Sequence, residues 1–352
     1  MDLLEKTVLG VMSGTSLDGV DLAMLHFEKK EVWKYSILAT ATIPYPEEWL
    51  ERLKHAVDLS KQDLAVLDRD YTLYLAKIIQ DFLGDQPLPP DFVSSHGHTV
   101  LHQPEKGITY QIGNLASLAK IVGHKVICNF RVADVALGGQ GAPLVPGGEI
   151  HLFSEYSACV NLGGFANISL LKNNPVVAFD ICPVNIVMNA LVHPLGLAFD
   201  HNGELARSGQ LIKDLLDQLN QLEFYKTIFP KSLGVEWVKD QVNPLLKQYR
   251  KRSTADILHT FCHHIAHQIV QQLPENGPVL FSGGGCFNGF LISLIRNLAK
   301  VEIILPSKDL IEYKEAMIFG FLGVLKELKL KNCLASVTGA QFDHASGEIF
   351  LP

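Results

Sequence analysis

The sequence predicts an α/β protein made of two similar lobes with a cleft between them. Each half of the chain opens with a strand, a turn of small residues and a second strand, at residues 7–27 and 158–171. The densest run of glycine and proline, residues 138–148, lies between these openings and marks the main crossing between lobes. A length of 352 residues suits two domains or one large one. We expect lobes at residues 1–145 and 146–352, with the C-terminal segment able to pack back on the first.

The elements of the first half follow from local patterns. Apolar runs that end at polar or glycine-rich segments predict strands at residues 7–12, 20–27, 92–95 and 125–129. Apolar residues at helical spacing predict helix across residues 47–82 and at residues 115–121.

The second half repeats this alternation of strands and helices. The same criteria predict strands at residues 158–162, 165–171, 176–179, 279–281 and 301–305. They predict helices at residues 211–222, 256–273, 288–298 and 314–328. The two halves are too loosely spaced for a tandem repeat, so we expect a duplicated domain instead.

Composition and charge exclude several classes of protein. Hydrophobic residues make up 47% of the chain and charged residues 19%, which supplies a core and argues against intrinsic disorder. A net charge of −7 without a long Lys/Arg cluster disfavours nucleic-acid and anionic-membrane binding. No apolar run reaches the roughly 18 residues of a bilayer span, and the first residues lack a secretory pattern. Six scattered cysteines without a Cys-x-x-Cys pair indicate reduced thiols, so we expect a cytoplasmic protein.

Three glycine-rich turns carry the main functional signal, at residues 13–16, 161–167 and 282–285. Small residues let the backbone approach an anion, and successive N–H groups form a concave array of donors. Ser13, Thr15 and Ser16 add hydroxyl groups, and Asp18 could hold Mg²⁺ through water. None of the turns is a Walker or Gly-x-Gly-x-x-Gly motif. Each alone could be a tight hairpin with polar caps, but the three together favour phosphate and nucleotide binding.

Asp180 follows the apolar run 176–179, so the sequence places it at the end of a strand. A carboxylate at the carboxyl end of a strand, facing the crevice of an α/β sheet, is well placed to act as a general base. The alternative is a helix N-cap, because Pro183 and a helix-like segment follow. A nucleophilic role for the neighbouring Cys182 is disfavoured, since no histidine partner is indicated.

Residues 10–21, GVMSGTSLDGVD, resemble the opening signature of the anhydro-N-acetylmuramic acid kinases. Further segments similar to that family occur at residues 95–100, 111–114, 129–134, 138–146, 161–168, 230–232, 283–288, 314–317 and 336–340. The resemblance implies an actin/hexokinase-like (ribonuclease H-like) fold with a central ATP cleft, ATP with Mg²⁺, and a cytoplasmic homodimer. The implied reaction phosphorylates O6 of 1,6-anhydro-N-acetylmuramic acid while water opens the anhydro ring. Its product, N-acetylmuramic acid 6-phosphate, belongs to the recycling of peptidoglycan.

The resemblance also implies roles for individual residues. Asp180 is the implied base that activates the attacking water. The implied phosphate-binding residues are Ser13, Gly14, Thr15, Ser16, Leu17, Asp18, Gly19, Val20, Asp21, Gly163, Gly164 and Asn167. Adenosine binding is assigned to Gly283, Gly284, Gly285 and Asn288. Sugar binding is assigned to His96, Gly97, Thr99, Arg131, Asp134 and Glu315.

This sequence departs from the family pattern beside the base. Typical members read Thr-Gly-Pro-Gly-Asn after the Phe-Asp pair, whereas this chain has Ile181, Cys182, Pro183, Val184 and Asn185, and Asn189 replaces a usual aspartate. The loop is therefore stiffer and more apolar, which affects sugar fit or rate. Two other readings remain open: a nucleotide-binding paralogue with weak or no turnover, and a kinase for a different amino sugar.

Two histidine clusters allow a metal site by spacing. His96, His98 and His102 follow a predicted strand, but no matching downstream ligand set is evident, and sugar hydrogen bonding or loop structure is favoured. The second cluster, on the helix predicted at residues 256–273, lacks the glutamate of the metalloprotease motif, and a solvated or dimer-facing helix is favoured.

Overall fold

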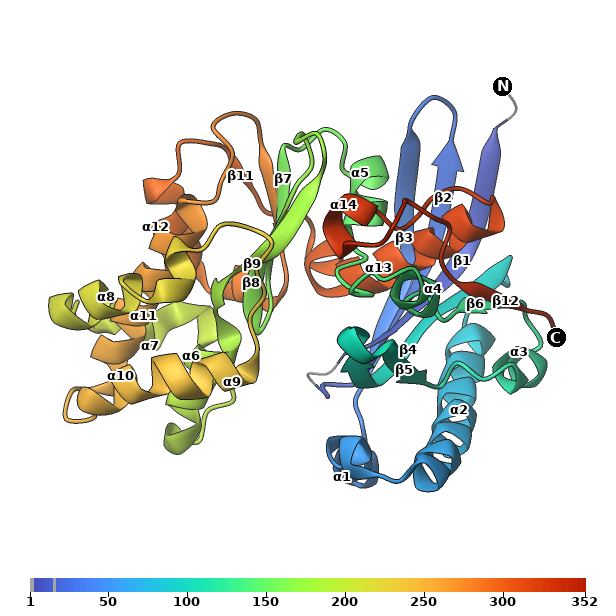
Figure 1. Ribbon diagram of the computed structural model, residues 1–352, viewed down its shortest axis with the longest axis horizontal. Helices are drawn as coiled ribbons and strands as arrows, with labels where there is room; N and C mark the ends of the chain where they lie inside the picture. The colour runs from blue at the N-terminus through green and yellow to red at the C-terminus, as the bar shows by residue number, and fades with distance from the viewer. Residues whose placement is uncertain (1–2, 15–16) are drawn as a thin grey trace. The chain divides into compact units, whose positions relative to one another are not determined.

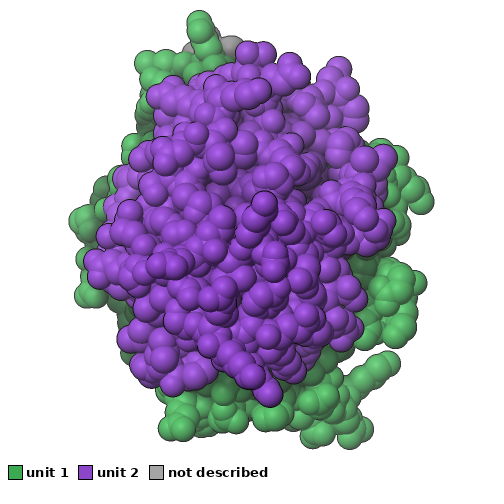
Figure 2. All heavy atoms as spheres, turned by 90° about the vertical axis from the view of Figure 1, so that its left-hand side faces the viewer, with its two compact units in different colours: residues 1–153, 313–352 green, residues 154–312 purple. Residues whose placement is uncertain are grey.

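The computed structural model describes residues 3–14 and 17–352 (Figure 1). The chain divides into two compact units, coloured separately in Figure 2. Unit 1 consists of Met1–Phe153 and Tyr313–Pro352, and unit 2 of Ser154–Glu312. The C-terminal residues from Tyr313 onward therefore belong to the same unit as the N-terminus.

Unit 1 is built on a mixed sheet with the strand order β12-β6-β4-β1-β2-β3, and β5 pairs with β4. The strands β1, β2 and β3 are antiparallel neighbours, while β4 and β6 run parallel to β1. The strands of this sheet are β1 (Leu4–Ser13), β2 (Val20–Lys29), β3 (Trp33–Ile43), β4 (Phe92–Gln103), β5 (Ile108–Ile112), β6 (Val126–Cys128) and β12 (Glu348–Phe350).

Unit 2 repeats this arrangement with five strands in the order β11-β10-β7-β8-β9. Here β7, β8 and β9 are antiparallel neighbours, and β10 and β11 run parallel to β7. Its strands are β7 (Ala158–Leu162), β8 (Phe165–Leu170), β9 (Val177–Pro183), β10 (Val279–Ser282) and β11 (Ile303–Ile304). The shared order and strand directions confirm the predicted duplicated α/β fold of the actin/hexokinase-like class.

Helices complete both units. Those assigned to unit 1 are α1 (Glu47–Lys54), α2 (Lys61–Gly84), α3 (Ser117–Val122), α4 (Val132–Ala136), α5 (Pro146–Leu152) and α14 (Ala335–Thr338). Those of unit 2 are α6 (Asn185–Val192), α7 (Glu204–Ser208), α8 (Lys213–Asn220), α9 (Val235–Trp237), α10 (Asn243–Gln248), α11 (Thr254–Val270) and α12 (Gly289–Leu298). Helix α13 (Lys308–Glu327) begins in unit 2 and lies mostly in unit 1.

The continuous helical pattern predicted across residues 47–82 is two helices, α1 and α2. The break spans residues 55–60 and ends at Ser60, whose hydroxyl accepts a hydrogen bond from the backbone N–H of Asp63 and caps α2. Such a cap satisfies one of the free N–H groups at a helix start. Periodicity alone missed it because the apolar spacing continues across the break.

Several strands of the structure lack a counterpart in the sequence analysis, notably β3, β5 and β12. Most residues of β3 are partly or fully exposed. An edge strand with little buried surface carries a weak hydrophobic pattern, so its pairing with β2 was not evident from the sequence.

Helix α13 packs closely against the central strands of unit 1. A Cβ atom added at Gly10 in β1 would overlap the backbone carbonyl of Ala316, so only glycine fits there. The Ser94 hydroxyl in β4 donates to the carbonyl oxygen of Phe319 at 2.6 Å. This contact fixes the helix that carries Lys314 and Glu315.

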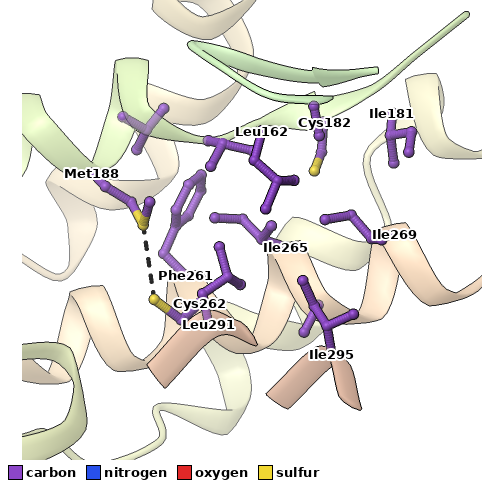
Figure 3. Close-up of a cluster of buried hydrophobic side chains, with 14 of the residues drawn as sticks. Leu162, Ile181, Cys182, Met188, Phe261, Cys262, Ile265, Ile269, Leu291 and Ile295 are labelled. Atoms are coloured by element: carbon purple, nitrogen blue, oxygen red, sulfur yellow. Dashed lines mark hydrogen bonds between the residues drawn. The ribbon is translucent and has the colours of Figure 1, made fainter. Parts of the chain in front are cut away.

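The core of unit 2 lies between its sheet and helices α6, α11 and α12. Figure 3 shows Leu162, Cys182, Phe261, Ile265 and Leu291 pointing into this cluster. The six cysteines all lie in the described part of the chain, where each is buried and none forms a disulfide. A search of the described helices for one long and apolar enough to cross a bilayer finds none.

Candidate active site

The first glycine-rich turn of unit 1 joins β1 to β2. The backbone N–H of Leu17 donates to the Gly14 carbonyl at 3.3 Å, and Leu17 takes φ = 62°. Asp18 is exposed, whereas Gly19 and Val20 are buried. Thr15 and Ser16, both predicted phosphate ligands, lie outside the described residues.

Ser13 belongs to a buried hydroxyl network beneath this turn. Its Oγ lies 2.5 Å from the Tyr45 hydroxyl and 3.1 Å from Nδ1 of His98, and Tyr71 donates to it at 2.8 Å. Burial lowers the pKa of His98 to about 4, so this ring is neutral at neutral pH. The hydrogen bonds of the Ser13 hydroxyl are thus made to Tyr45, Tyr71 and His98 inside unit 1.

Asp21 is also engaged within unit 1. It is the second residue of β2 and pairs with Met12, and its carboxylate accepts a 2.6 Å hydrogen bond from Thr42 of β3. Asp18 is therefore the more accessible carboxylate of the segment.

The second turn and the late glycine run lie together in unit 2. A Cβ added at Gly283, which has φ = 82°, would approach Leu162 of β7 within 3.0 Å. The Gly163 carbonyl accepts from the backbone N–H of Asn185 at 3.3 Å, and Gly164 accepts from Val184 at 2.8 Å. Gly164 and Gly284 are exposed. Two segments 120 residues apart thus form one accessible glycine surface at the start of α6.

Asn288 has a structural role within this surface. It is buried, and its Oδ1 caps α12 by accepting from the Leu291 N–H at 2.9 Å. Its amide Nδ2 lies 4.0 Å from the sulfur of Met188.

A row of polar side chains crosses four strands of unit 2. In the strand register Ser282 pairs with Asn161, Asn161 with Asn167, and Asn167 with Asp180. Residues paired directly across neighbouring strands share one face of a sheet. Asn161, Asn167 and Asp180 are each partly exposed. The row therefore aligns the acid with the residues that flank the second turn.

Asp180 lies inside β9 rather than at the end of a strand, so that prediction was wrong. The strand continues to Pro183, and the helix that follows is capped at Val184, which also excludes the N-cap reading. Proline is tolerated because β9 is an edge strand, where one side needs no donor.

The carboxylate of Asp180 is held by the loop between the 3₁₀ turn η5 (Glu223–Lys226) and α9. The backbone N–H of Leu233 donates to its Oδ2 at 2.8 Å, and the Asp180 N–H donates to the Lys231 carbonyl at 3.2 Å. Burial raises the pKa of the Asp180 carboxyl above its ordinary value, and the Leu233 hydrogen bond partly opposes this. A raised pKa makes the carboxylate a better proton acceptor.

Residues 181–184, which depart from the family pattern, are part of the hydrophobic core of unit 2. Ile181, Cys182, Pro183 and Val184 are all buried, and Figure 3 shows the Cys182 thiol directed into the hydrophobic cluster. Burial raises the pKa of that thiol, so it stays protonated. A protonated, buried thiol is a poor nucleophile, which agrees with the sequence analysis, where a nucleophilic role for Cys182 is disfavoured.

Unit 1 places several predicted sugar ligands near one another. His96 donates from Nδ1 to the Gly97 carbonyl at 2.8 Å and accepts at Nε2 from Arg131 at 2.9 Å. These partners fix the neutral tautomer, and burial holds the pKa of His96 well below its ordinary value. Arg131 also donates to the Gly141 carbonyl at 2.6 Å. Thr99, partly exposed, accepts from Gln111 at 3.4 Å.

Asp134 is fully buried, and its carboxylate accepts hydrogen bonds from separate segments of unit 1. Its carboxylate accepts from the Gly141 N–H and the Thr338 hydroxyl, both at 2.7 Å. Its side chain therefore secures the loop that Arg131 also contacts and is not exposed for direct sugar binding.

Glu315 projects from α13 and is reached by solvent. Desolvation by the surrounding protein groups raises the pKa of this carboxyl even though solvent reaches part of the side chain, and the charges of Lys314 and Arg131 oppose the increase. The adjacent Lys314 forms a buried ion pair with Glu149 at 2.5 Å. Burial lowers the pKa of Arg131 to about 10, with Glu315 the leading opposing charge, so the guanidinium stays charged at neutral pH.

Neither histidine cluster converges on a common point among the described residues. His96 and His98 turn to different partners, Arg131 and Ser13. Most of helix α11 is buried, but the face that carries His259, His263 and His267 is partly or fully exposed, so a solvated or dimer-facing role for that face stays a prediction. His264 lies inside the unit between Asn220 and Tyr225, at 2.7 and 2.9 Å.

Three residues to which the sequence analysis assigns no role contribute to the site. Asn185 lines the glycine surface, its Nδ2 donating to the Leu162 carbonyl at 3.3 Å. Lys231 and Leu233 hold the backbone and carboxylate of Asp180. Residues 230–232 had been noted only as a family-like segment, and nothing local in the sequence links them to Asp180.

Comparisons with known proteins agree on one family. The family model described as anhydro-N-acetylmuramic acid kinase matches residues 6–352. A protein of that name from Pseudomonas fluorescens (strain Pf0-1) is 34% identical over 361 residues, covering 97% of this chain and 98% of its own length. One from Bacillus cereus (strain 03BB102) is 32% identical over 378 residues, covering 98% and 99%.

Among solved structures, component A of (R)-2-hydroxyglutaryl-CoA dehydratase from Acidaminococcus fermentans matches with a TM-score of 0.43 and 13% identity. The match covers 90% of this chain and 96% of that one. A likeness this weak adds nothing to the strand topology described above.

Proposed function

The chain belongs to the anhydro-N-acetylmuramic acid kinase family, and on that premise we propose its specific reaction and the residues that perform it. It is a kinase that uses ATP and a sugar hydroxyl as acceptor. The proposed acceptor is O6 of 1,6-anhydro-N-acetylmuramic acid, and the proposed product is N-acetylmuramic acid 6-phosphate, formed during peptidoglycan recycling. The observation that carries the proposal is the polar row ending at Asp180 beside the glycine surface of unit 2.

The glycine surface supports nucleotide binding. Gly163 and Gly164 supply backbone groups to the phosphates, and Asn167 adds an amide donor. Gly283, Gly284 and Gly285 present flat backbone to the adenosine, with Asn288 holding α12 in place. The first turn, Gly14 to Asp21, is proposed to hold phosphate through backbone N–H groups, because the Ser13 hydroxyl is otherwise engaged.

Mg²⁺ fits the exposed carboxylate of Asp18, which suits an ion that keeps most of its water ligands. Bound there, the ion would offset the negative charge of the phosphates. Phosphoryl transfer depends mainly on positioning and charge stabilisation, which backbone donors provide.

Asp180 is the proposed general base. It accepts a proton from water as the water oxygen attacks C1 of the sugar. The C1–O6 bond breaks, O6 attacks the γ-phosphorus, and the bond from that phosphorus to the ADP oxygen breaks. The Leu233 N–H fixes the orientation of the carboxylate during this step.

Sugar recognition is proposed for His96, Gly97, Thr99, Arg131 and Glu315. Charged and hydrogen-bonding groups held by internal partners suit a polar sugar, because their orientation is set before it binds. Asp134 contributes by holding the Gly141 loop. The Arg131 guanidinium suits the lactyl carboxylate of the muramic acid.

The pH dependence of activity reports on Asp180. A base works only when deprotonated, so kcat/KM falls as pH drops through the pKa of Asp180. Because burial raises that pKa, we expect the acid limb at a higher pH than an ordinary aspartate gives. Steady-state rates measured across pH in wild type and in Leu233→Pro, which removes the N–H donor, check this. In the variant, the fall of kcat/KM at acid pH is expected at a still higher pH than in wild type. If the pH of this fall is the same in both, the group that titrates is not Asp180.

Glu315→Gln tests sugar recognition. The variant removes the negative charge of Glu315, which interacts with the positive charge of Arg131. We expect the KM for the sugar to rise by about tenfold, the effect of losing one charge-assisted hydrogen bond to the sugar. The ATP KM is expected to stay within about twofold. Equal increases in both constants would place Glu315 outside the sugar site.

A kinase assay with a panel of sugars tests the reaction itself. ADP release from ATP and Mg²⁺ that requires 1,6-anhydro-N-acetylmuramic acid supports the proposal. Release with another amino sugar supports a different specificity, and nucleotide binding without turnover supports an inactive paralogue. The buried segment 181–184 leaves Asp180 partly exposed, which favours activity over the inactive reading.

A cytoplasmic homodimer completes the proposal and rests on the family resemblance. Light scattering coupled to gel filtration is expected to give twice the chain mass of 38.9 kDa. A monomer at micromolar concentration would contradict it.

A further inference from the structure

Three potential metal ligands of unit 1 converge on one point. They are Asp134 in α4, Cys333 before α14 and His344 in the C-terminal segment, and their ligand atoms all lie within 4.8 Å of one another. The Cys333 thiol donates to Oδ1 of Asp134 at 3.0 Å, and Nε2 of His344 lies 3.7 Å from the same oxygen. Asp134 is fully buried and the His344 side chain is only 9% exposed.

The histidine in this cluster has an unused nitrogen. Nδ1 of His344 lies 3.1 Å from the Phe342 carbonyl, which can only accept, so Nδ1 carries the proton. In the neutral ring Nε2 then holds a lone pair. This buried atom has no hydrogen-bond partner in the described part of the chain. An unpartnered buried polar atom calls for a physical explanation, because such atoms are costly.

We propose that Asp134, Cys333 and His344 form a binding site for a zinc-class divalent cation. The tautomer of His344 is the one that metal-binding histidines adopt, with the other N–H donated to a backbone carbonyl. Tetrahedral zinc with these ligands separates ligand atoms by about 3.4 Å, and the observed 3.0 and 3.7 Å lie on either side of that value. Water fills the fourth position.

Binding requires the thiolate of Cys333, so the thiol proton leaves to solvent as the sulfur–metal bond forms. Asp134 keeps its hydrogen bonds from Gly141 and Thr338, because each carboxylate oxygen accepts more than one partner. Thiolate and imidazole ligands select zinc-class ions over Mg²⁺, so this site is distinct in chemistry from the Mg²⁺ proposed at Asp18.

The site ties two segments of unit 1 together. Cys333 and His344 already pair through backbone hydrogen bonds in both directions. The metal adds a link from this pair to α4, and through Asp134 to the loop at Gly141. It would therefore order the C-terminal segment and the loop that Arg131 contacts.

Metal titration of the chelator-treated full chain tests the proposal without reference to kinase activity. Zn²⁺ competed against a chromophoric chelator is expected to bind with one tight equivalent and to release about one proton. Co²⁺ in its place is expected to give a thiolate-to-metal charge-transfer band in the near ultraviolet. Absence of a tight equivalent in wild type overturns the site.

Two variants and a control locate the ion. His344→Gln and Cys333→Ser are each expected to weaken binding by at least about 100-fold, since even outer-shell partners cost 10–100-fold. Cys333→Ser also removes the charge-transfer band and keeps a donor to Asp134, so it is the variant that preserves packing, as circular dichroism verifies. The control, His26→Gln, alters the second convergent group, Glu5 with His26 and Glu28. Binding lost in the control, or retained in Cys333→Ser, overturns the assignment.

Discussion

Replacing Asp180 with asparagine is expected to lower kcat by at least about 100-fold, the usual effect of losing a general base. The amide keeps the size of the side chain and an oxygen that accepts from the Leu233 N–H, so β9 and its loop stay in place. It cannot accept a proton from water. Affinity for ATP is expected to be unchanged, because the nucleotide contacts proposed above do not include this carboxylate.

Two measurements separate a catalytic from a structural effect. Steady-state kinetics give kcat, and calorimetric titration of a non-hydrolysable ATP analogue gives the nucleotide Kd. Asp240→Asn is a suitable control, since it removes an exposed carboxylate of the same unit. Near-normal turnover in Asp180→Asn would remove this residue from the mechanism.

Replacing Gly164 with valine is expected to weaken ATP binding by about 100-fold. The loss corresponds to about 3 kcal/mol, roughly two charge-assisted hydrogen bonds from the turn to phosphate. An added Cβ would meet only Cβ of Ile186, at 3.9 Å, so the fold accommodates the side chain. The valine methyl groups instead occupy the space that the phosphates require.

Gly84→Val provides the matched control for that prediction. Gly84 ends α2 in unit 1, is exposed, and has open space around an added Cβ. The Kd of the Gly84→Val variant for the ATP analogue is expected to equal that of the wild-type protein. If Gly164→Val also binds ATP normally while remaining folded, the phosphate assignment of the second turn is wrong.

The strand–turn–strand openings were predictable because each hairpin is a local feature. Its alternating apolar residues and small turn residues lie within about ten positions of one another, and the structure places β1–β2 and β7–β8 there. The third strands were harder. The predicted strand ends at residue 179, whereas β9 continues to Pro183, because Asp180 interrupts the apolar run in the sequence. In the structure Asp180 is tolerated inside the strand, since β9 is an edge strand and the Leu233 N–H binds the carboxylate.

The candidate site was predictable in its residue types but less so in its arrangement. Asp180, Asn167 and the glycines could be named from the chain, yet their alignment with Asn161 and Ser282 depends on strand register. Ser13 and Asp134 read as ligands in the sequence, whereas burial and internal hydrogen bonds give both a structural role. The histidines of α11 look alike in the sequence, but the structure buries His264 between Asn220 and Tyr225 and leaves His267 exposed.

Sequence alone determined the duplicated α/β class and the family and named Asp180 as the candidate base, because these rest on local periodicity and on residue identity. The tertiary structure decided which polar groups remain accessible to solvent and which form the internal hydrogen bonds that stabilise the fold. It brought residue 134 to residues 333 and 344, and residue 162 against residues 283 and 285, pairings that no local pattern encodes. The physical reason is that long-range packing, register and the pairing of buried polar groups are settled only when the whole chain is folded.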